Sequence, residues 1–426
     1  MFVYLAVLCS CETNTPQSNI ITPTATSSQQ RNANTAATEP GVSPILLYSA
    51  EQIAKWDPTY AGSIDNVIDH QPSNSVVAVM NVLERFLIEH AMVDDNPWAL
   101  THGVLALGIE QKTVSGGNPL ETLFDYAEVK HHNELSYTNF PRKTNKGNRE
   151  ILVEPHSDLI AKVLSERRVA MNTPAKSTDE QTLLLKNHYQ GLLWRTHLNP
   201  KTNQSSFASP NDMAWGTQAL LSLLPPGSKW VSEGKLIMDI NQLAMFIIAI
   251  LAQETKPLKL AMNSNAAIEK NGKGIFKYTC GGSHLLQTAA HVVANGYGNE
   301  HAARELQQQI SLHFYRLPQE LSIYDAALKK HPEHKHQLLI QRLKFTGHFV
   351  ETSMKFQKLG LLTPTQRQQT MIDGAVKQII LVVEALRQDG VFSNIEKLKT
   401  DNHQLYLDLI GDSAHALYAL KLMYSD

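Results

Sequence analysis

Residues 411–422 read GDSAHALYALKL: small and polar residues come first, and a run rich in alanine and leucine follows. Such a pattern is typical of a helix start. Five further segments share it: DNPWALTHGVLAL from Asp95, EPHSDLIAKVL from Glu154, SPNDMAWGTQALLSLL from Ser209, CGGSHLLQTAAHVV from Cys280 and FTGHFVETSMKF from Phe345. In three of them Pro97, Pro155 or Pro210 takes the first helical position, where the missing N–H of proline costs nothing. The sequence therefore predicts six similar helices.

Aligning the six segments makes one position in each equivalent, and five of these positions are histidine. The six residues are His102, His156, Trp215, His284, His348 and His415. They recur at intervals of roughly 60 residues, which fits a helix pair with two loops, whereas known solenoid repeats run roughly 34 to 47 residues. We therefore expect an all-α fold, in which about six helical hairpins of residues 44–426 close into a ring.

Other helices are predicted from apolar periodicity. Between residues 366 and 388 apolar side chains recur every three or four positions, Thr365 with Gln368 makes a capping box, and Asp389-Gly390 makes a stop. A second amphipathic helix is expected over Val76–Ile88. The apolar run Leu243–Ala252 is too short to span a bilayer and predicts a buried core helix.

This rhythm, with the short HG, CGG and GDSAH patterns, resembles the α/α-toroid architecture. Terpene cyclases, protein prenyltransferases, lanthionine synthetase C-like proteins and several glycan lyases and glycosidases share that architecture. The resemblance covers nearly all of residues 60–426 and implies inner helices whose N-termini face one mouth of a central cavity. Inner helices of prenyltransferases and lanthionine synthetase C-like proteins hold zinc through Cys, His and Asp or a second Cys. This chain lacks a Cys-His dipeptide, which argues against lanthionine chemistry.

The first residues predict a location. The apolar run Met1–Cys9 is too short for a membrane span, and Leu8-Cys9-Ser10-Cys11 resembles a bacterial lipobox, although no Lys or Arg precedes the run. We expect residues 1–11 to be a signal peptide, Cys11 to be lipidated, and residues 12–43, rich in Thr, Ser, Asn and Gln, to be a disordered tether. This predicts a membrane-anchored lipoprotein of the bacterial cell envelope. Of the three cysteines only Cys280 then remains in the body.

Composition excludes one class of partner. The chain has 426 residues with 38 basic and 40 acidic side chains, so its net charge of -2 gives no electrostatic footprint for nucleic acid. Gly-x-Ser-x-Gly, HExxH and GxxxxGK[ST] motifs are absent, so common hydrolase, zincin and kinase mechanisms are not indicated.

The histidines at equivalent positions are the main candidates for chemistry, because a closed ring would bring them together. Cys280 with His284, and Asp412 with His415, each share one helix face. Cys280, His284 and His415 are therefore candidate ligands of a zinc ion. Two alternatives stay open: a metal-free functional histidine cluster, and purely structural roles for these residues.

A glycan or small molecule is the expected ligand, since the envelope supplies such compounds. His102, His284 and His415 are candidate general bases, with Asp412 as a further catalytic candidate. Contacts with the substrate are expected from Trp98, Trp215, His348 and Tyr278. Glycosidase chemistry would need two facing carboxylates, and Asp95, Glu154, Asp212, Glu351 and Asp412 all lie near predicted helix starts.

Two functional hypotheses follow. In the first, the chain is a lyase, hydrolase or transferase that acts on an envelope glycan or small molecule in its cavity. In the second, it is a non-catalytic binding or scaffold protein that displays a helical ring on a lipid tether. The five matched histidines favour the enzyme slightly.

Overall fold

The computed structural model describes residues 43–62, 64–68, 70–177, 181–199, 201–202 and 204–424. The predicted signal peptide, the lipidation site Cys11 and almost the whole predicted tether lie outside these residues. Among the described residues there are fifteen α-helices and eleven short strands, so the fold is mostly helical. No helix in these ranges is both long and apolar enough to cross a membrane.

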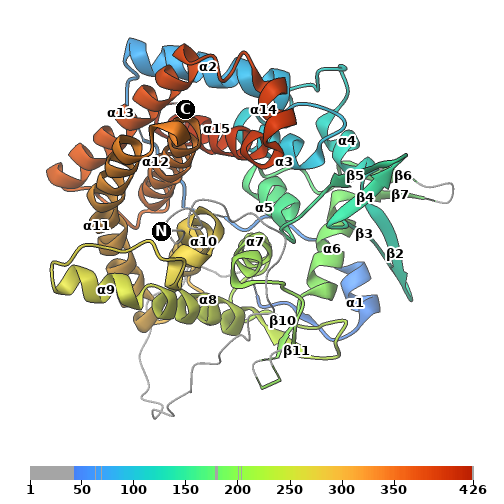
Figure 1. The fold of residues 1–426 in the computed structure, drawn as a ribbon. Coiled ribbons are helices and arrows are strands. Elements are labelled where there is room, and N and C mark those ends of the chain that lie inside the picture. The colour runs from blue at the N-terminus through green and yellow to red at the C-terminus, as the bar shows by residue number, and fades with distance from the viewer. Residues whose placement is uncertain are drawn as a thin grey trace.

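Six helices make successive contacts: α3 contacts α5, α5 contacts α7, α7 contacts α10, α10 contacts α12, α12 contacts α15, and α15 contacts α3 (Figure 1). These helices, which we call the contact helices, carry the six repeated segments or follow directly after them. Their bounds are α3 Pro97–Leu107, α5 Leu159–Glu166, α7 Pro210–Leu221, α10 Ser283–Ala294, α12 Lys335–Lys358 and α15 His403–Tyr424.

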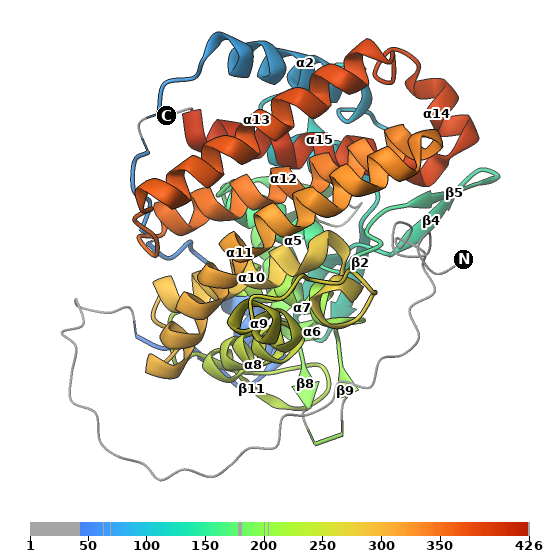
Figure 2. The same ribbon diagram turned by 60° about the vertical axis from the view of Figure 1, so that its left-hand side comes forward.

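Most of the remaining helices lie further from the centre of the molecule in Figure 1. Helix α2 contacts α3, α13 and α15, while α8 contacts α7 and α10, and α11 contacts α10 and α12. Their bounds are α1 Ala50–Lys55, α2 Asn74–His90, α4 Pro119–Asp125, α6 Leu185–Arg195, α8 Ile240–Glu254, α9 Lys256–Asn263, α11 Glu300–Lys330, α13 Gln366–Gln388 and α14 Ile395–Asp401. In the turned view of Figure 2, α13, α12 and α11 lie side by side, in agreement with the contacts between them.

Small sheets occupy the connections between helices, so the expectation of a purely helical chain was too simple. β1 (Leu46–Leu47) pairs in parallel with β10 (Lys229–Val231), which pairs with β11 (Ile237–Asp239). The other strands form two-stranded hairpins: β2 Glu128–His132 with β3 Leu135–Asn139, β4 Lys143–Lys146 with β5 Arg149–Leu152, β6 Pro174–Ser177 with β7 Thr182–Leu184, and β8 Leu198–Asn199 with β9 Gln204–Ser205. The longest strands, β2 and β3, have only five residues each, so alternation along the sequence gives at most a weak signal.

Local helix signals were predicted well. Thr365 and Gln368 form the expected capping box, α13 ends at Gln388, and Gly390 has the positive φ of a helix stop. Helix α2 covers the predicted Val76–Ile88, and α8 covers Leu243–Ala252 with Asp239 as its N-cap.

Three of the six predicted helix starts were wrong. Helix α12 begins at Lys335 and α15 at His403, well before the small residues that the repeat placed at their starts. Pro155 precedes α5 by several residues, whereas Pro97 and Pro210 do take the first helical position. The small residues in α12 and α15 have another role: a β-carbon on Gly347 would lie 3.1 Å from the backbone nitrogen of Ala416. They permit two helices to cross closely.

A candidate metal centre among buried histidines

The six equivalent residues of the repeat lie in one continuous series of ring contacts, which we call the histidine series. Five of them are buried side chains of the contact helices, and the sixth, His156, lies in the segment before α5 and is partly exposed. The distances between ring centroids are 4.8 Å for His156 and Trp215, 5.0 Å for Trp215 and His284, 5.1 Å for His284 and His348, 4.0 Å for His348 and His415, and 5.7 Å for His415 and His102. From His156 to His415 the ring contacts follow the order of the residues in the chain, and the last contact returns from His415 to His102.

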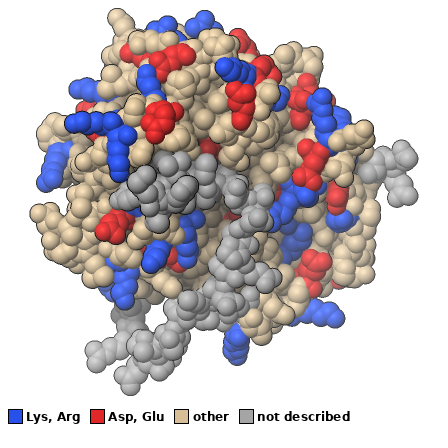
Figure 3. Space-filling model, viewed as in Figure 1, with Lys and Arg blue, Asp and Glu red and all other residues tan. Residues whose placement is uncertain are grey.

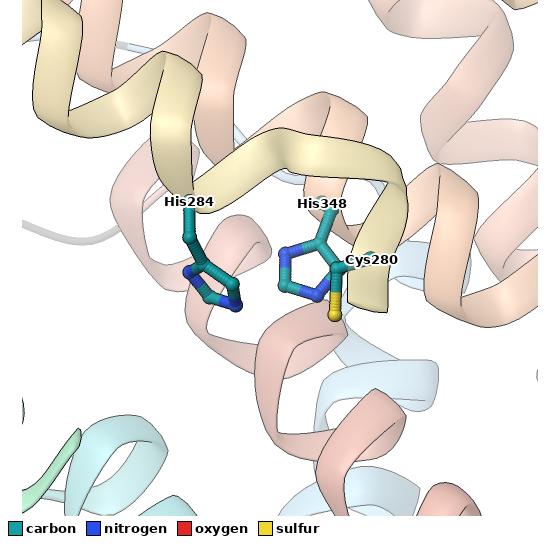
Figure 4. Close-up of side chains that lie close together, drawn as sticks. All are labelled: Cys280, His284 and His348. Atoms are coloured by element: carbon teal, nitrogen blue, oxygen red, sulfur yellow. The ribbon is translucent and has the colours of Figure 1, made fainter. Parts of the chain in front are cut away.

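Within this series Cys280 lies beside His284 and His348. One ligand atom from each of the three residues lies within 4.8 Å of the others. Figure 4 shows the three side chains directed into the same space, with Cys280 on the segment just before α10, His284 in the first turn of α10 and His348 on α12. The imidazoles are buried, whereas Cys280 is partly exposed. Sulfur and imidazole nitrogen are the donors that zinc prefers.

The third member of this set differs from the predicted one. His415 was expected beside Cys280 and His284, but His348 takes that place. His415 belongs to a second candidate group, with His348 and Glu351, whose ligand atoms also lie within 4.8 Å of one another. His348 is therefore common to both groups.

Glu351 fixes the orientation of two imidazoles. Its Oε2 accepts hydrogen bonds from Nδ1 of His348 (3.1 Å) and Nδ1 of His415 (2.9 Å). Lys355 lies 2.7 Å from Oε1 and, with His415, holds the pKa of Glu351 well below its usual range against the effect of burial. Since an ionised carboxylate only accepts hydrogen bonds, both histidines carry their proton on Nδ1 and keep the lone pair of Nε2.

In the set with Cys280, two ring nitrogens are buried without a hydrogen-bond partner among the described residues: Nε2 of His348 and Nδ1 of His284. Both residues belong to the set with Cys280. A buried polar atom without a partner costs free energy, and a metal ion would satisfy both nitrogens at once. The donor set of Cys280, His284 and His348 therefore fits a metal ion.

Burial determines the protonation of the histidines. It lowers the pKa of His102 to about 4 and that of His415 to about 3, and it lowers the pKa of His284 and His348 as well. The imidazoles are thus neutral at physiological pH, which is the form that binds metals. A near-neutral general base was expected at His102, His284 or His415, and the lowered pKa of each residue does not fit that role.

A buried chain of charges continues from Glu351. Lys355 forms ion pairs with Glu351 and Glu166, and Glu166 also pairs with Lys162. Gln287 accepts a further hydrogen bond from Lys355 at 2.9 Å. Sequence reasoning listed Glu351 without a partner and overlooked the lysines. A signal for part of the chain was present, because His348, Glu351 and Lys355 follow one face of a helix at steps of three and four.

The other predicted residues lie at the edges of this group. The ring of Trp98 packs on His102 at 4.1 Å, and the carbonyl of Trp98 accepts a hydrogen bond from His102 Nδ1. Asp412 is buried one turn before His415, and burial raises its pKa well above the usual value. Tyr278 lies two residues before Cys280, with the ammonium of Lys277 over its ring.

A second polar group lies near His156. Nδ1 of His156 is 3.5 Å from Asp212, and Asp158 is 3.4 Å from Arg195. Oε1 of the buried Glu154 accepts a hydrogen bond from the backbone N–H of Ile160 at 2.8 Å. Of the five acidic residues that were expected near helix starts, Glu154 and Asp212 thus lie near the His156 end of the histidine series. On the outer surface, acidic and basic side chains are interspersed (Figure 3).

Comparisons with models of known families, with curated proteins and with solved structures find no match for this chain.

Proposed function

We propose that this chain is a zinc-dependent enzyme of the bacterial cell envelope, with Cys280, His284 and His348 as the metal ligands. The observation that carries the proposal is the pair of buried nitrogens, His284 Nδ1 and His348 Nε2, that lack partners among the described residues beside Cys280. Three protein ligands and an open fourth position are typical of catalytic zinc sites, whereas structural sites have four protein ligands.

The residues of the chain have distinct roles in this proposal. Glu351 orients His348 through Nδ1, so that Nε2 is directed away from the carboxylate and toward the ion. Lys355 keeps Glu351 ionised, and His415 packs against His348 and shares the same carboxylate. Zinc, when bound, supplies a Lewis acid that makes water or another nucleophile reactive at neutral pH.

An envelope glycan or small molecule is the proposed substrate. Trp98, which is partly buried, lies at one end of the histidine series, and the partly exposed His156 lies at the other. Since Cys280 is the exposed member of the ligand set, we propose that the substrate reaches the ion from the side of Cys280. Aromatic rings at the ends of such a site suit stacking on sugars or other ring compounds.

The proposed architecture is an α/α toroid. Its inner wall would be the six contact helices, and its outer wall would include α2, α4, α6, α8, α11 and α13. The support is the order of contacts, in which each contact helix touches the next and α15 touches α3. We further propose that a lipid on Cys11 anchors the chain to the envelope membrane.

Metal analysis of the purified full-length chain tests the zinc site. The protein is prepared without a histidine tag, and its zinc content is compared with that of Cys280→Ser, His284→Ala and the control His131→Ala, which alters an exposed histidine. We expect stoichiometric zinc in the wild type and the control and a loss of zinc in both ligand variants. Equal metal content in all four proteins would refute the proposal.

The anchor has a separate test, because it does not depend on the metal. Cys11→Ala should move the protein from the membrane fraction to the soluble fraction of the cells that express it. Unchanged partitioning would refute lipidation and leave the zinc site unaffected.

A further inference from the structure

The backbone that presents Cys280 has an unusual conformation. Cys280, Gly281 and Gly282 have φ values of 59°, 56° and 74°, so three successive residues are left-handed directly before α10. Side chains other than glycine rarely adopt this conformation, and such residues cluster at functional sites where the surroundings hold them in place. The strain at Cys280 therefore requires a contact that fixes this segment.

Arg316 on α11 provides that contact. Its Nη1 donates a hydrogen bond to the carbonyl oxygen of Gly281 at 3.1 Å. A β-carbon on Gly281 would lie 2.7 Å from Nη2 of Arg316, and one on Gly282 would collide with Ile275. The two glycines thus allow the guanidinium and the apolar side chain to close directly on the backbone next to Cys280.

Arg316 is itself held rigidly. Nε and Nη2 donate to Oε1 of Glu320 at 2.9 and 2.7 Å, and the ring of Phe276 lies 5.2 Å from the guanidinium. Lys270 donates to the second oxygen of Glu320 at 2.8 Å. Burial alone would raise the pKa of Glu320, but the nearby charges of Lys270 and Arg316 lower it. One buried carboxylate with two cationic partners is a costly arrangement that only good geometry makes favourable.

Helix α11 also contacts the chain beside the second imidazole of the site. His313, one turn before Arg316, stacks on Phe349 with a centroid distance of 4.2 Å. Its Nε2 lies 3.2 Å from the carbonyl oxygen of Phe349 and 3.0 Å from the hydroxyl of Ser353. Phe349 follows His348 directly. Helix α11 therefore contacts the backbone next to two of the proposed ligands: through Arg316 beside Cys280, and through His313 beside His348.

We propose that Arg316, fixed by Glu320, is a positioning residue that sets the affinity of the metal site by directing Cys280 toward His284 and His348. The proposal rests on the proposed function, because it requires that these three residues bind a metal. Arg316 touches neither the ion nor the substrate; it acts only through the backbone carbonyl of Gly281.

Cobalt binding tests this role, because a Co²⁺ ion in such a site has an absorption band that reports the bond to the thiolate. Full-length wild type, Arg316→Lys, Arg316→Gln and the control Arg304→Gln are stripped of metal and titrated with Co²⁺ in competition with a chelator. Arg304 pairs with Glu300 on the same helix but is exposed. Lysine at position 316 keeps a cation beside Glu320 but cannot donate to both Glu320 and Gly281.

We expect the wild type and Arg304→Gln to bind Co²⁺ equally, with the thiolate band. Arg316→Lys should remain folded by circular dichroism, bind at least about tenfold more weakly and lose band intensity, as expected for supporting contacts of metal ligands. Arg316→Gln should lose more.

Each other outcome is decisive. Wild-type affinity and an unchanged band in a folded Arg316 variant would overturn this inference and leave the zinc site intact. A wild type without any thiolate band would refute the proposed function itself. If both Arg316 variants fail to fold while Arg304→Gln folds, Arg316 serves the stability of the whole chain, and the positioning role is wrong.

Discussion

Glu351 binds three buried side chains at once. One of its oxygens serves two histidines and the other serves Lys355, and the residue is fully buried on α12. Burying such a carboxylate is costly, so its three partners must offset the loss of hydration. The packing of α12 against α15 does not require such a buried polar group, which favours a functional role for it.

Replacing Glu351 by glutamine should weaken both metal binding and folding. Glutamine removes one of the two carboxylates that pair with the buried Lys355, leaving Glu166, and it no longer imposes one tautomer on His348. We expect a loss of about 3–5 kcal/mol in the free energy of unfolding. Zinc affinity should fall by roughly 10–100-fold, as for other residues that orient metal ligands. Urea unfolding and chelator competition measure the two effects.

Glu333→Gln is the matched control for this change. Glu333 also lies next to a histidine, with 3.2 Å to Nδ1 of His331, but both side chains are partly or well exposed. Its replacement should leave the free energy of unfolding nearly unchanged, because exposed ion pairs contribute little to stability. An effect as large as that of Glu351→Gln would contradict the importance that we assign to burial.

Glu154 gives the protein a pH dependence of its own. Burial first, and then repulsion from Asp158, raises the pKa of Glu154 to about 8, from its ordinary value of 4.5. At a pH between these two pKa values, Glu154 is protonated in the folded chain but ionised in the unfolded chain. The stability that Glu154 contributes is therefore fully present below pH 4.5 and is lost at up to about 1.4 kcal/mol per pH unit as the pH rises toward 8.

The variant Glu154→Gln stays neutral and should remove this slope. The free energy of unfolding of the variant, relative to that of the wild type, should increase steadily between about pH 5 and pH 8. The exposed Glu134→Gln serves as control and should run parallel to the wild type. Parallel curves for all three proteins would show that Glu154 is ionised in the folded chain.

At the scale of elements, two helical glycines have opposite surroundings. A β-carbon on Gly347 of α12 would meet the backbone of Ala416 on α15 at 3.1 and 3.2 Å, whereas one on Gly374 of α13 would meet nothing within 4 Å. Backbone atoms cannot move aside as a flexible side chain can. The close crossing of α12 and α15 therefore depends on the absence of a side chain at Gly347. This crossing lies next to the proposed ligand His348, which directly follows Gly347 in the chain.

Alanine at these two positions should change stability in opposite directions. Gly374→Ala should stabilise the protein by about 0.5–1 kcal/mol, because alanine restricts the unfolded chain and favours the helix. Gly347→Ala should destabilise it by about 1–3 kcal/mol through overpacking. Thermal or urea unfolding of both variants measures this. A stabilising Gly347→Ala would mean that α12 and α15 can separate without cost.

A feature of the fold could be predicted from the sequence when neighbouring residues in the chain determine it, and could not when a contact between distant helices determines it. The capping box of α13 involves neighbours in the chain and was predicted correctly, as was a helix over Leu243–Ala252, which α8 covers. The glycines of the repeated segments were interpreted as helix starts, but Gly347 and Gly411 lie inside helices and pack against Ala416 and Trp98. A small residue has the same appearance in a sequence whether it ends a helix or admits a neighbour.

The candidate site was predictable in part for the same reason. The repeat alone identified the six residues that now form the histidine series, since an equivalent place in each unit implies proximity. The pairing of Glu351 with His415 joins α12 to α15, and the contact of Arg316 with Gly281 joins α11 to the segment before α10. Such pairings depend on the relative rotation of whole helices, which no local pattern encodes.

At the scale of the whole molecule, α15 is the last contact helix, and it contacts both α12, which precedes it, and α3, the first contact helix. It is also among the most buried helices, with sixteen buried residues from Leu405 to Met423. Removing it would expose the apolar faces of its neighbours and separate His415 from His348 and His102.

A chain that ends at Asn402 should therefore lose cooperative unfolding. Shortening the β4–β5 hairpin around Gly147 also removes residues, but these are mostly exposed, and the variant should keep the wild-type transition. Calorimetry or urea unfolding followed by circular dichroism distinguishes the two. A sharp transition in the truncated chain would show that the other helices fold as an independent unit.

The contact between α3 and α15 also sets an order of events in time. The two helices lie far apart in the described chain, so their contact closes a very long loop, and such contacts slow folding. A ribosome must release α15 and all the residues between α3 and α15 before the two helices can meet. Until then the faces that α15 covers stay open to solvent, and a newly made chain is at its most vulnerable to aggregation and proteolysis. The proposed ligands Cys280, His284 and His348 all precede α15. The proposed metal site is therefore complete in the growing chain before α15 is in place.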